Sequence, residues 1–166
     1  EGVPQDHVEA VRWYRMAAKQ RLAIAQYFLG YIYQNGKGVP QDDAQAVRWY
    51  RLAAEQGHAA AQSSLGWMYS KGEGVPQDDA QAVRWYRMAA GQGNSTGQYF
   101  LGVMYSIGFG VPQDYATAHM WLNIAAANGS DSAVNRRNIA ADRMTAADIS
   151  EAQRRARICM ESGYQE

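Results

Sequence analysis

The residue types that most often carry catalysis or bind metals are scattered along this chain. Its 166 residues include three histidines, His7, His58 and His119, and one cysteine, Cys159. No two histidines share the three- or four-residue helical spacing with which two imidazoles reach one metal ion. A single cysteine allows neither an internal disulfide nor a cysteine-based metal knuckle. We therefore predict no metal site and no cofactor.

Other features of catalytic type have a structural explanation. Cys159 lies on the apolar stripe of a predicted helix, so we expect a packed thiol rather than a nucleophile. Asp42 and Asp43 stand at a helix start, where carboxylates complement the helix dipole. Three Gly-x-Gly pairs follow predicted helices rather than strands, which indicates turns and not a dinucleotide fingerprint: Gly36/Gly38, Gly72/Gly74 and Gly108/Gly110. We predict that the chain is not an enzyme.

The elements that position these residues belong to a repeat of 36 residues. The tetrapeptide Val-Pro-Gln-Asp occurs four times, at residues 3–6, 39–42, 75–78 and 111–114. Tryptophans keep the same step, at Trp13, Trp49, Trp85 and Trp121. A period of this length indicates stacked supersecondary units, each too small to bury its apolar face alone.

The first half of each repeat predicts a helix. In residues 42–56 the apolar side chains follow the i, i+3, i+4, i+7, i+8 spacing of one helical face: Ala46, Trp49, Tyr50, Ala53 and Ala54. Asp42 with Gln45 forms a capping-box pattern, as does Asp6 with Glu9 one repeat earlier. Gly57 is placed for a left-handed helix end.

The second half of each repeat predicts another helix, at about residues 58–70. Four residues share its apolar face: Ala61, Leu65, Met68 and Tyr69. Gly66 lies beside that face, where a missing side chain lets a neighbour come close. No segment alternates with the two-residue period of a strand, so we predict an all-α protein built from antiparallel helix pairs.

These residues resemble a known family. The pattern Ala46-x-x-Trp49-Tyr50-x-x-Ala53-Ala54-x-x-Gly57, followed by Ala61-x-x-x-Leu65-Gly66-x-x-Tyr69, is similar to the Sel-one-like repeat (SLR). The resemblance implies a right-handed α/α superhelical solenoid of the tetratricopeptide type, with about nine helices. It also implies a scaffolding, adaptor or signalling role, and the family has many bacterial members.

We divide the chain, residues 1–166, into one solenoid domain. Its predicted parts are a leading helix, three full repeats and a degenerate last repeat, at 1–20, 21–56, 57–92, 93–128 and 129–166. The last repeat replaces Leu, Gly and Tyr of the pattern by Arg137, Asn138 and Ala141. Arg21 stands where the other repeats have glycine, so we expect the first turn to close differently.

The two ends of the chain differ. Residues 145–160 leave the repeat and predict a capping helix, with a Thr145…Asp148 capping box. Its apolar stripe consists of Ile149, Ala152, Ala156 and Cys159. The N-terminal helix, at about 6–20, has no preceding partner helix. We expect that either earlier repeats or, by self-association, a second copy of the chain covers this N-terminal helix.

Comparison of the repeats predicts where a partner binds. Residues 39–51 and 75–87 are identical, so the first helix is mostly scaffold. On the second helix several positions point away from the Leu/Tyr face, and large aromatic side chains there indicate a covered surface. By the tetratricopeptide analogy they line a concave groove for an extended peptide or a helix. We call them the groove residues: Tyr27, Tyr31, Gln34, Ser63, Trp67, Lys71, Tyr99, Val103 and Asn135.

Two neighbouring features leave alternatives open. Phe28 and Phe100, on the flank of the groove, either join it or pack between neighbouring hairpins. Arginines at equivalent positions of the first helices form either a solvated outer face or an anion-binding ladder: Arg12, Arg48, Arg84 and Arg15, Arg51, Arg87. Nearby carboxylates favour the solvated face because they neutralise the ladder: Glu9, Asp43, Glu55 and Asp79.

We predict a non-catalytic scaffold that binds a protein or peptide. The alternative is a small-molecule binder or β-lactamase-like hydrolase related to cysteine-rich SLR proteins, but those relatives have paired cysteines in each repeat. Sixteen basic residues balance sixteen acidic ones, which gives no argument for nucleic acid. No run approaches the ~18 apolar residues of a membrane span. The compartment stays open: cytoplasm, or periplasm and exterior if a leader was removed.

Overall fold

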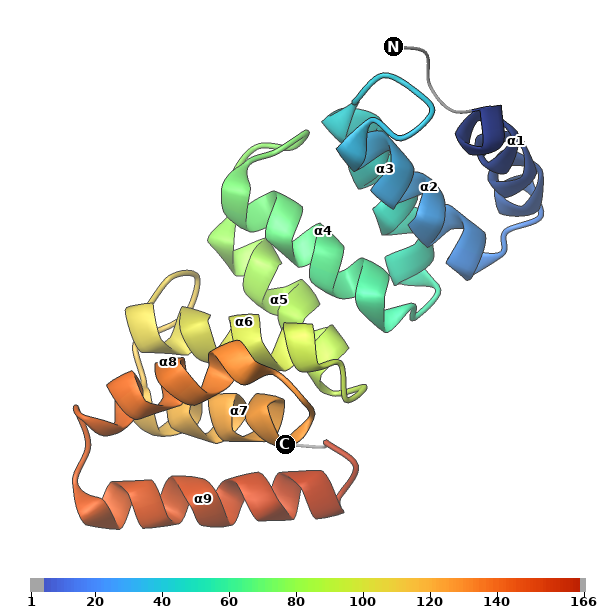
Figure 1. Ribbon diagram of the computed structural model, residues 1–166. Helices are drawn as coiled ribbons and strands as arrows, with labels where there is room; N and C mark the ends of the chain where they lie inside the picture. The colour runs from blue at the N-terminus through green and yellow to red at the C-terminus, as the bar shows by residue number, and fades with distance from the viewer. Residues whose placement is uncertain (1–4, 165–166) are drawn as a thin grey trace. The chain divides into compact units, whose positions relative to one another are not determined.

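The protein is all-α in the part that the structure describes. The computed structural model describes residues 5–164, and within that range it contains nine helices and no strand, as the repeat predicts (Figure 1). The helices are α1 Gln5–Lys19, α2 Ala23–Asn35, α3 Asp43–Glu55, α4 Ala59–Lys71, α5 Asp79–Ala90, α6 Ser95–Ile107, α7 Tyr115–Ala127, α8 Asp131–Ala141 and α9 Ala146–Glu161.

The chain forms two compact units, Glu1–Asp78 and Asp79–Glu166. Unit 1 contains α1 to α4 and unit 2 contains α5 to α9. Within unit 1 each helix packs on the next, and α2 and α3 lie side by side in Figure 1. In unit 2 the same order holds from α5 to α8, and α9 returns to pack on α7. Consecutive helices joined by such short connections form antiparallel hairpins.

The aspartate of the Val-Pro-Gln-Asp motif caps the first helix of a repeat. Asp42 Oδ1 accepts the backbone N–H of Gln45 at 2.9 Å, which confirms the predicted N-cap. The reciprocal half of the capping box is absent at this described helix start because the Asp42 N–H donates to the Tyr33 carbonyl at 2.9 Å instead. The side chain of Asp6, predicted to cap the first repeat with Glu9, lies outside the described residues.

The conformation at the helix ends contradicts the prediction for the first turn, at Arg21. Gly57 adopts the expected left-handed conformation, with φ +86°. Arg21, at the equivalent position one repeat earlier, adopts the same conformation with φ +61°. The first turn therefore closes as the others do, and the expectation of a different closure was wrong. A side chain with a Cβ pays a steric cost in this region, which the surrounding hairpin must offset.

Small residues allow the helices of neighbouring hairpins to come close together. Alanines at the helix contacts have no exposed surface, among them Ala46, Ala53 and Ala54 of α3. Gly30 of α2 lies directly against the Tyr50 ring of α3, where a Cβ atom would come within 2.5 Å of the ring carbon Cδ1. Tyr50 is fully buried by this contact and its neighbours.

The two phenylalanines left open by the sequence pack inside their own hairpins. Phe28 of α2 stacks on Tyr14 of α1 with ring centroids 5.1 Å apart. Phe100 of α6 stacks on Tyr86 of α5 at the same 5.1 Å. Their partners are thus the first helix of the same hairpin, not a neighbouring hairpin as one alternative had it.

The C-terminal cap has the predicted construction. Thr145 and Asp148 form a complete capping box at the start of α9. Ala152, Ala156 and Cys159 of the predicted apolar stripe are buried, and α9 packs on α7. Burial of the Cys159 thiol confirms that this cysteine belongs to the packing of the cap.

The Gly30–Tyr50 contact yields a stability prediction. We expect Gly30→Ala to lower the free energy of unfolding by about 1–3 kcal/mol, because the added methyl must displace the Tyr50 ring. The better helix propensity of alanine, worth up to about 1 kcal/mol, offsets only part of this cost. Urea denaturation followed by circular dichroism measures the change.

Gly91→Ala is the matched control, because the nearest atom to a Cβ there, the Arg87 carbonyl oxygen, is an ordinary contact at 3.5 Å. It should leave the urea midpoint unchanged or raise it. Equal stabilities of the Gly30→Ala and Gly91→Ala proteins would contradict the proposed role of the α2–α3 close approach.

Candidate protein-binding surface

The groove residues lie on the second helices of the hairpins, as predicted. In unit 1 they occupy α2 and α4, and in unit 2 they occupy α6 and α8. Their surroundings differ from one position to the next. Some are open to solvent, some are half-buried in aromatic contacts, and one is fully inside the packing.

Tyr31 is the most open aromatic groove residue in unit 1, with 39% of its surface exposed. The Lys37 ammonium donates to the Tyr31 hydroxyl at 2.9 Å and lies 4.6 Å from the ring centroid. The ammonium thus combines a hydrogen bond to the phenol with a cation–π contact to the ring, and both restrain Tyr31. Tyr31 therefore presents an exposed aromatic ring whose hydroxyl is fixed by a hydrogen bond.

Gln34 connects three helices beneath that surface. Its Oε1 accepts the Tyr50 hydroxyl of α3 at 2.7 Å, and its Nε2 donates to the Met68 sulfur of α4 at 3.5 Å. Burial raises the pKa of the Tyr50 hydroxyl well above its ordinary value, so Tyr50 stays a neutral donor. Gln34 thus serves mainly to join α2, α3 and α4.

Tyr27 belongs to an aromatic cluster rather than to an open surface. Its ring stacks on the His58 imidazole with centroids 4.9 Å apart and lies 5.9 Å from the Tyr50 ring. It is half-buried. Tyr27 is therefore restrained by rings of its own helix, of α3 and of the α4 N-cap.

The α4 groove residues show the full range of exposure. Trp67 is half-buried and Lys71 is exposed. Ser63 is only 5% exposed, and its hydroxyl donates to the Ala60 carbonyl at 3.0 Å. Ser63 therefore packs within its hairpin, since its short side chain does not reach beyond the helix surface.

The groove residues of unit 2 are partly covered by their own unit. Tyr99 lies edge-on to Phe100 with centroids 5.1 Å apart. Tyr99 and Val103 are half-buried against the cluster formed by Leu122, Ala125 and Ala133. Asn135 of α8 is exposed.

One set of contacts was missed from the sequence. The second arginine row does not stand free, because each guanidinium donates to the tyrosine hydroxyl eighteen residues later. The pairs are Arg15–Tyr33 at 2.7 Å, Arg51–Tyr69 at 2.9 Å and Arg87–Tyr105 at 2.8 Å. The recurring i, i+18 spacing of Arg and Tyr was the signal that could have identified them.

The first arginine row, Arg12, Arg48 and Arg84, is exposed, as the solvated-face alternative expects. Arg48 and Arg84 lie about 6 Å from the rings of the tryptophans that follow them, at 6.0 and 5.8 Å. Among the described residues, none of the carboxylates expected to neutralise the rows forms an ion pair with them. Any neutralisation of this row by those carboxylates therefore acts without a direct ion pair.

The histidines show no metal chemistry in the described part of the chain. No group of three His, Cys, Asp or Glu side chains there is arranged to hold a metal ion. His58 caps α4, with its Nδ1 accepting the Ala61 N–H at 3.2 Å. His119 is buried in α7, and the side chain of His7 lies outside the described residues.

Comparison with known proteins gives a family match over most of the chain. The model of the Sel1 repeat matches residues 1–22, 23–58, 59–94 and 95–130. Among curated proteins no sequence matches. None of the helices within residues 5–164 combines the length and apolar character needed to cross a membrane.

Three solved bacterial structures are similar. The protective antigen c5321 of uropathogenic Escherichia coli, which displays an SLR fold, is 47% identical with a TM-score of 0.74 over 75% of this chain. A Sel1 repeat protein from Oxalobacter formigenes is 40% identical with a TM-score of 0.71 over 76%. Cysteine-rich protein B of Helicobacter pylori is 21% identical with a TM-score of 0.64 over 81%, a likeness of fold. The matched region makes up 27%, 50% and 96% of those chains, respectively.

The capping role of His58 predicts a pH-dependent stability. Burial lowers the pKa of His58 and of His119, with Arg137 adding to the effect at His119. Below about pH 6.5 the unfolded chain therefore binds more protons than the folded chain. The free energy of unfolding decreases as the pH is lowered through this range. Above that pH the contribution of both histidines is fully present.

His58→Asn tests this with a residue that the chain already uses. Asn94 holds the equivalent position on α6 and accepts the Gly97 N–H at 2.8 Å. We expect His58→Asn to keep the cap and to reduce the loss of stability between pH 7 and 5, leaving the part due to His119. Urea denaturation at a series of pH values measures it, and an unchanged pH profile would contradict the assignment.

Proposed function

Because the chain belongs to the Sel1-repeat family, we propose that it is a non-catalytic scaffold or adaptor that binds a protein or peptide along the second helices of its hairpins. Sel1-repeat proteins in general mediate protein–protein interactions. This chain spans 27% of the Escherichia coli antigen and 50% of the Oxalobacter formigenes protein, so the activity of a whole protein of that kind is part of the proposal.

The observation that carries the proposal is the set of side chains on α2 and α4 of unit 1. Tyr31 and Trp67 offer aromatic surface, Lys71 offers a free charge, and the half-buried Tyr27 lies below them. Tyrosine and tryptophan are the residues most enriched among interface anchors because they bury much area at little entropic cost. The first helices of the two middle repeats offer less variation for recognition, since residues 39–51 and 75–87 are identical.

The groove residues of unit 2 are proposed to form a surface of that unit by itself, more apolar than the one in unit 1. Tyr99 and Val103 are half-buried there, and Asn135 offers a polar contact at the edge. A helix or extended segment fits such a face through anchors at helical or alternating spacing.

The double variant Tyr31→Ala, Trp67→Ala tests the proposal. We expect a folded helical protein that loses its partner, with about 2 kcal/mol of binding free energy lost for each ring a partner covers. A partner captured by the wild-type protein and identified by mass spectrometry is then titrated calorimetrically against both proteins.

Phe109→Ala is the matched control, since it removes an exposed ring that follows α6 and lies outside the groove residues. It should bind the partner as the wild type does. Unchanged binding by the double variant, or collapse of its urea stability, would assign Tyr31 and Trp67 to the fold instead.

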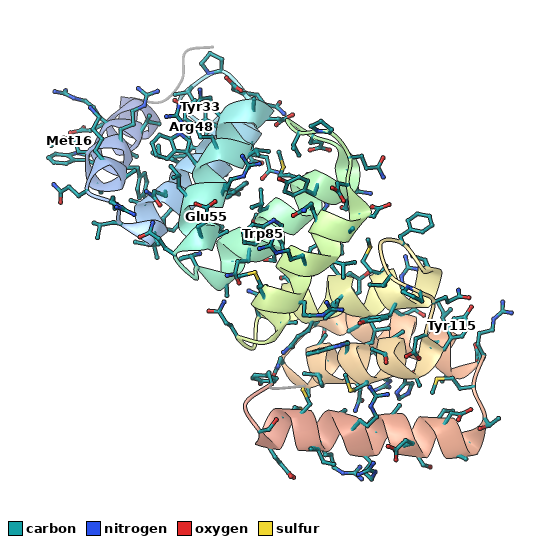
Figure 2. The ribbon with its side chains drawn as sticks, turned by 180° about the vertical axis from the view of Figure 1, so that it is seen from behind. Met16, Tyr33, Arg48, Glu55, Trp85 and Tyr115 are labelled. Atoms are coloured by element: carbon teal, nitrogen blue, oxygen red, sulfur yellow. The ribbon has the colours of Figure 1, made fainter. Side chains whose placement is uncertain are left out.

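We further propose that α1 mediates self-association. Trp49 of α3 packs against Ala18, Ala25 and Leu29 of the preceding hairpin. Trp13 holds the same repeat position on α1 and is 63% exposed, and Met16 beside it is 55% exposed. They line a hollow of about 140 Å³ together with Glu9 and Arg12, and Figure 2 shows Met16 on the outer side of α1.

Light scattering after size exclusion, over a wide range of protein concentration, tests self-association. The wild-type mass should rise with concentration, whereas Trp13→Ser combined with Met16→Ser should stay monomeric. Met88→Ser, which changes an exposed residue of α5, is the control and should behave like the wild type. A wild-type mass that stays monomeric throughout would contradict the proposal.

A further inference from the structure

Unit 1 contains a crevice that shares no residue with the groove. It lies where α1 ends, α2 begins and α3 ends, and its volume is about 310 Å³. Its lining includes Arg21, Gln26, Trp49, Leu52, Glu55 and Gln56, and Figure 2 labels Glu55 at the end of α3. This volume is at the lower limit for small-molecule pockets, so the crevice suits a single side chain better than a larger ligand.

The equivalent place in unit 2, two repeats further along the chain, is occupied by Tyr164. The Tyr164 hydroxyl lies 3.1 Å from Nδ2 and 3.2 Å from Oδ1 of Asn128, the counterpart of Gln56. Its ring lies against Gly93, the counterpart of Arg21, where a Cβ atom would be 2.8 Å from the ring carbon Cε2. The protein itself therefore shows which side chain this kind of crevice accepts.

A glycine turn presents Tyr164 to that place. Gly163 and Tyr164 both adopt left-handed backbone conformations, with φ +73° and +69°. The Tyr164 N–H donates to the Cys159 carbonyl at 2.7 Å, which closes the end of α9. The turn leaves the tyrosine ring projecting from the chain, a geometry that a partner polypeptide can also adopt.

The polar floor is the same in both units. In unit 2 the Asn128 amide donates to Gln98 Oε1 at 2.9 Å, and in unit 1 the Gln56 amide donates to Gln26 Oε1 at 2.6 Å. Asn128 Oδ1 accepts the Tyr164 hydroxyl, whereas Gln56 Oε1 has no hydrogen-bond partner among the described residues. Unit 1 thus keeps the acceptor that holds a phenol in unit 2.

The walls of the two places differ. Arg21 replaces Gly93, so a ring in unit 1 must lie further out than Tyr164 does and can stack on the guanidinium. Arg21 and Glu55 are exposed and form no ion pair within the described residues. The indole N–H groups of Trp49 and Trp121 are buried without a partner in both units, so they do not distinguish the two places.

We propose that the unit 1 crevice binds a tyrosine side chain of a partner polypeptide, with the phenol hydroxyl donating to Gln56 and the ring stacked on Arg21. The tyrosine is presented by a glycine turn, as in Ser162-Gly163-Tyr164 of this chain. The site is separate from the groove and adds a second point of attachment for a partner, which raises affinity without enlarging the first contact.

The probe is a synthetic peptide with the sequence of residues 161–166, Glu-Ser-Gly-Tyr-Gln-Glu, titrated into the full chain. We expect saturable NMR shifts of the Gln56 and Gln26 side-chain amides and of the Trp49 indole, with one site. Replacing the peptide tyrosine by phenylalanine, or Gln56 by leucine, should weaken binding about five-fold, the value of one neutral hydrogen bond. Gln56→Asn, the residue of unit 2, should keep binding.

Tyr164→Ala provides a second measurement, because it opens the equivalent place in unit 2. It should raise the peptide stoichiometry from one to two, after circular dichroism has verified the fold. Should that variant unfold, the Gln56→Leu and phenylalanine-peptide titrations on the wild-type background decide the matter.

Three results would overturn the proposal: no saturable binding to the wild type, equal binding of the tyrosine peptide and its alanine version, or no weakening by Gln56→Leu. The groove variant Tyr31→Ala, Trp67→Ala should bind the peptide as the wild type does. Loss of peptide binding there would instead place the tyrosine site on the groove, and so separates the two proposals.

Discussion

Close approach between helix backbones is the constraint on which the rest of the structure depends. It requires residues with little or no side chain at fixed places, such as Gly30 under the Tyr50 ring and the fully buried alanines of α3. Once the helices are this near, Tyr50 is buried deeply enough that its hydroxyl must find a partner, which Gln34 provides at 2.7 Å. The polar connection is thus a consequence of the close packing.

The same packing also places the second arginine row of the repeat against tyrosine hydroxyls. Each Arg–Tyr pair spans the two helices of one hairpin. The carbonyl of that tyrosine also accepts the N–H of the aspartate in the next Val-Pro-Gln-Asp motif, in all three pairs. One tyrosine therefore joins the first helix of its own hairpin to the start of the next. The partners of these arginines are neutral phenol hydroxyls rather than carboxylates. Salt should therefore weaken these contacts less than it weakens surface ion pairs.

Much of the fold could be predicted from the sequence, because the same capping residues, apolar spacing and turn glycines recur in several repeats. Helix limits, the Asp42 and Thr145 caps, the left-handed Gly57 and the buried stripe of α9 all follow from local patterns. Arg21 was misjudged since its conformation is imposed by the hairpin and not by its own preference. A local propensity of about 1 kcal/mol yields when the packing on both sides specifies the turn.

The candidate site was less predictable, because exposure at the edge of a helical face depends on side-chain length and on neighbours. Tyr27 and Ser63 hold the same repeat position, yet Tyr27 reaches a ring cluster while Ser63 stays within its hairpin. A period identifies equivalent positions but not what surrounds each of them.

Differences between equivalent positions are therefore the informative ones. His58 and Asn94 cap with different chemistry, so only one of the two helix starts responds to acid. Arg21 and Gly93 border equivalent crevices, and the glycine admits the Tyr164 ring where the arginine keeps an open wall. A repeat protein gains specific sites in this way, by changing one side chain in a backbone geometry that stays the same.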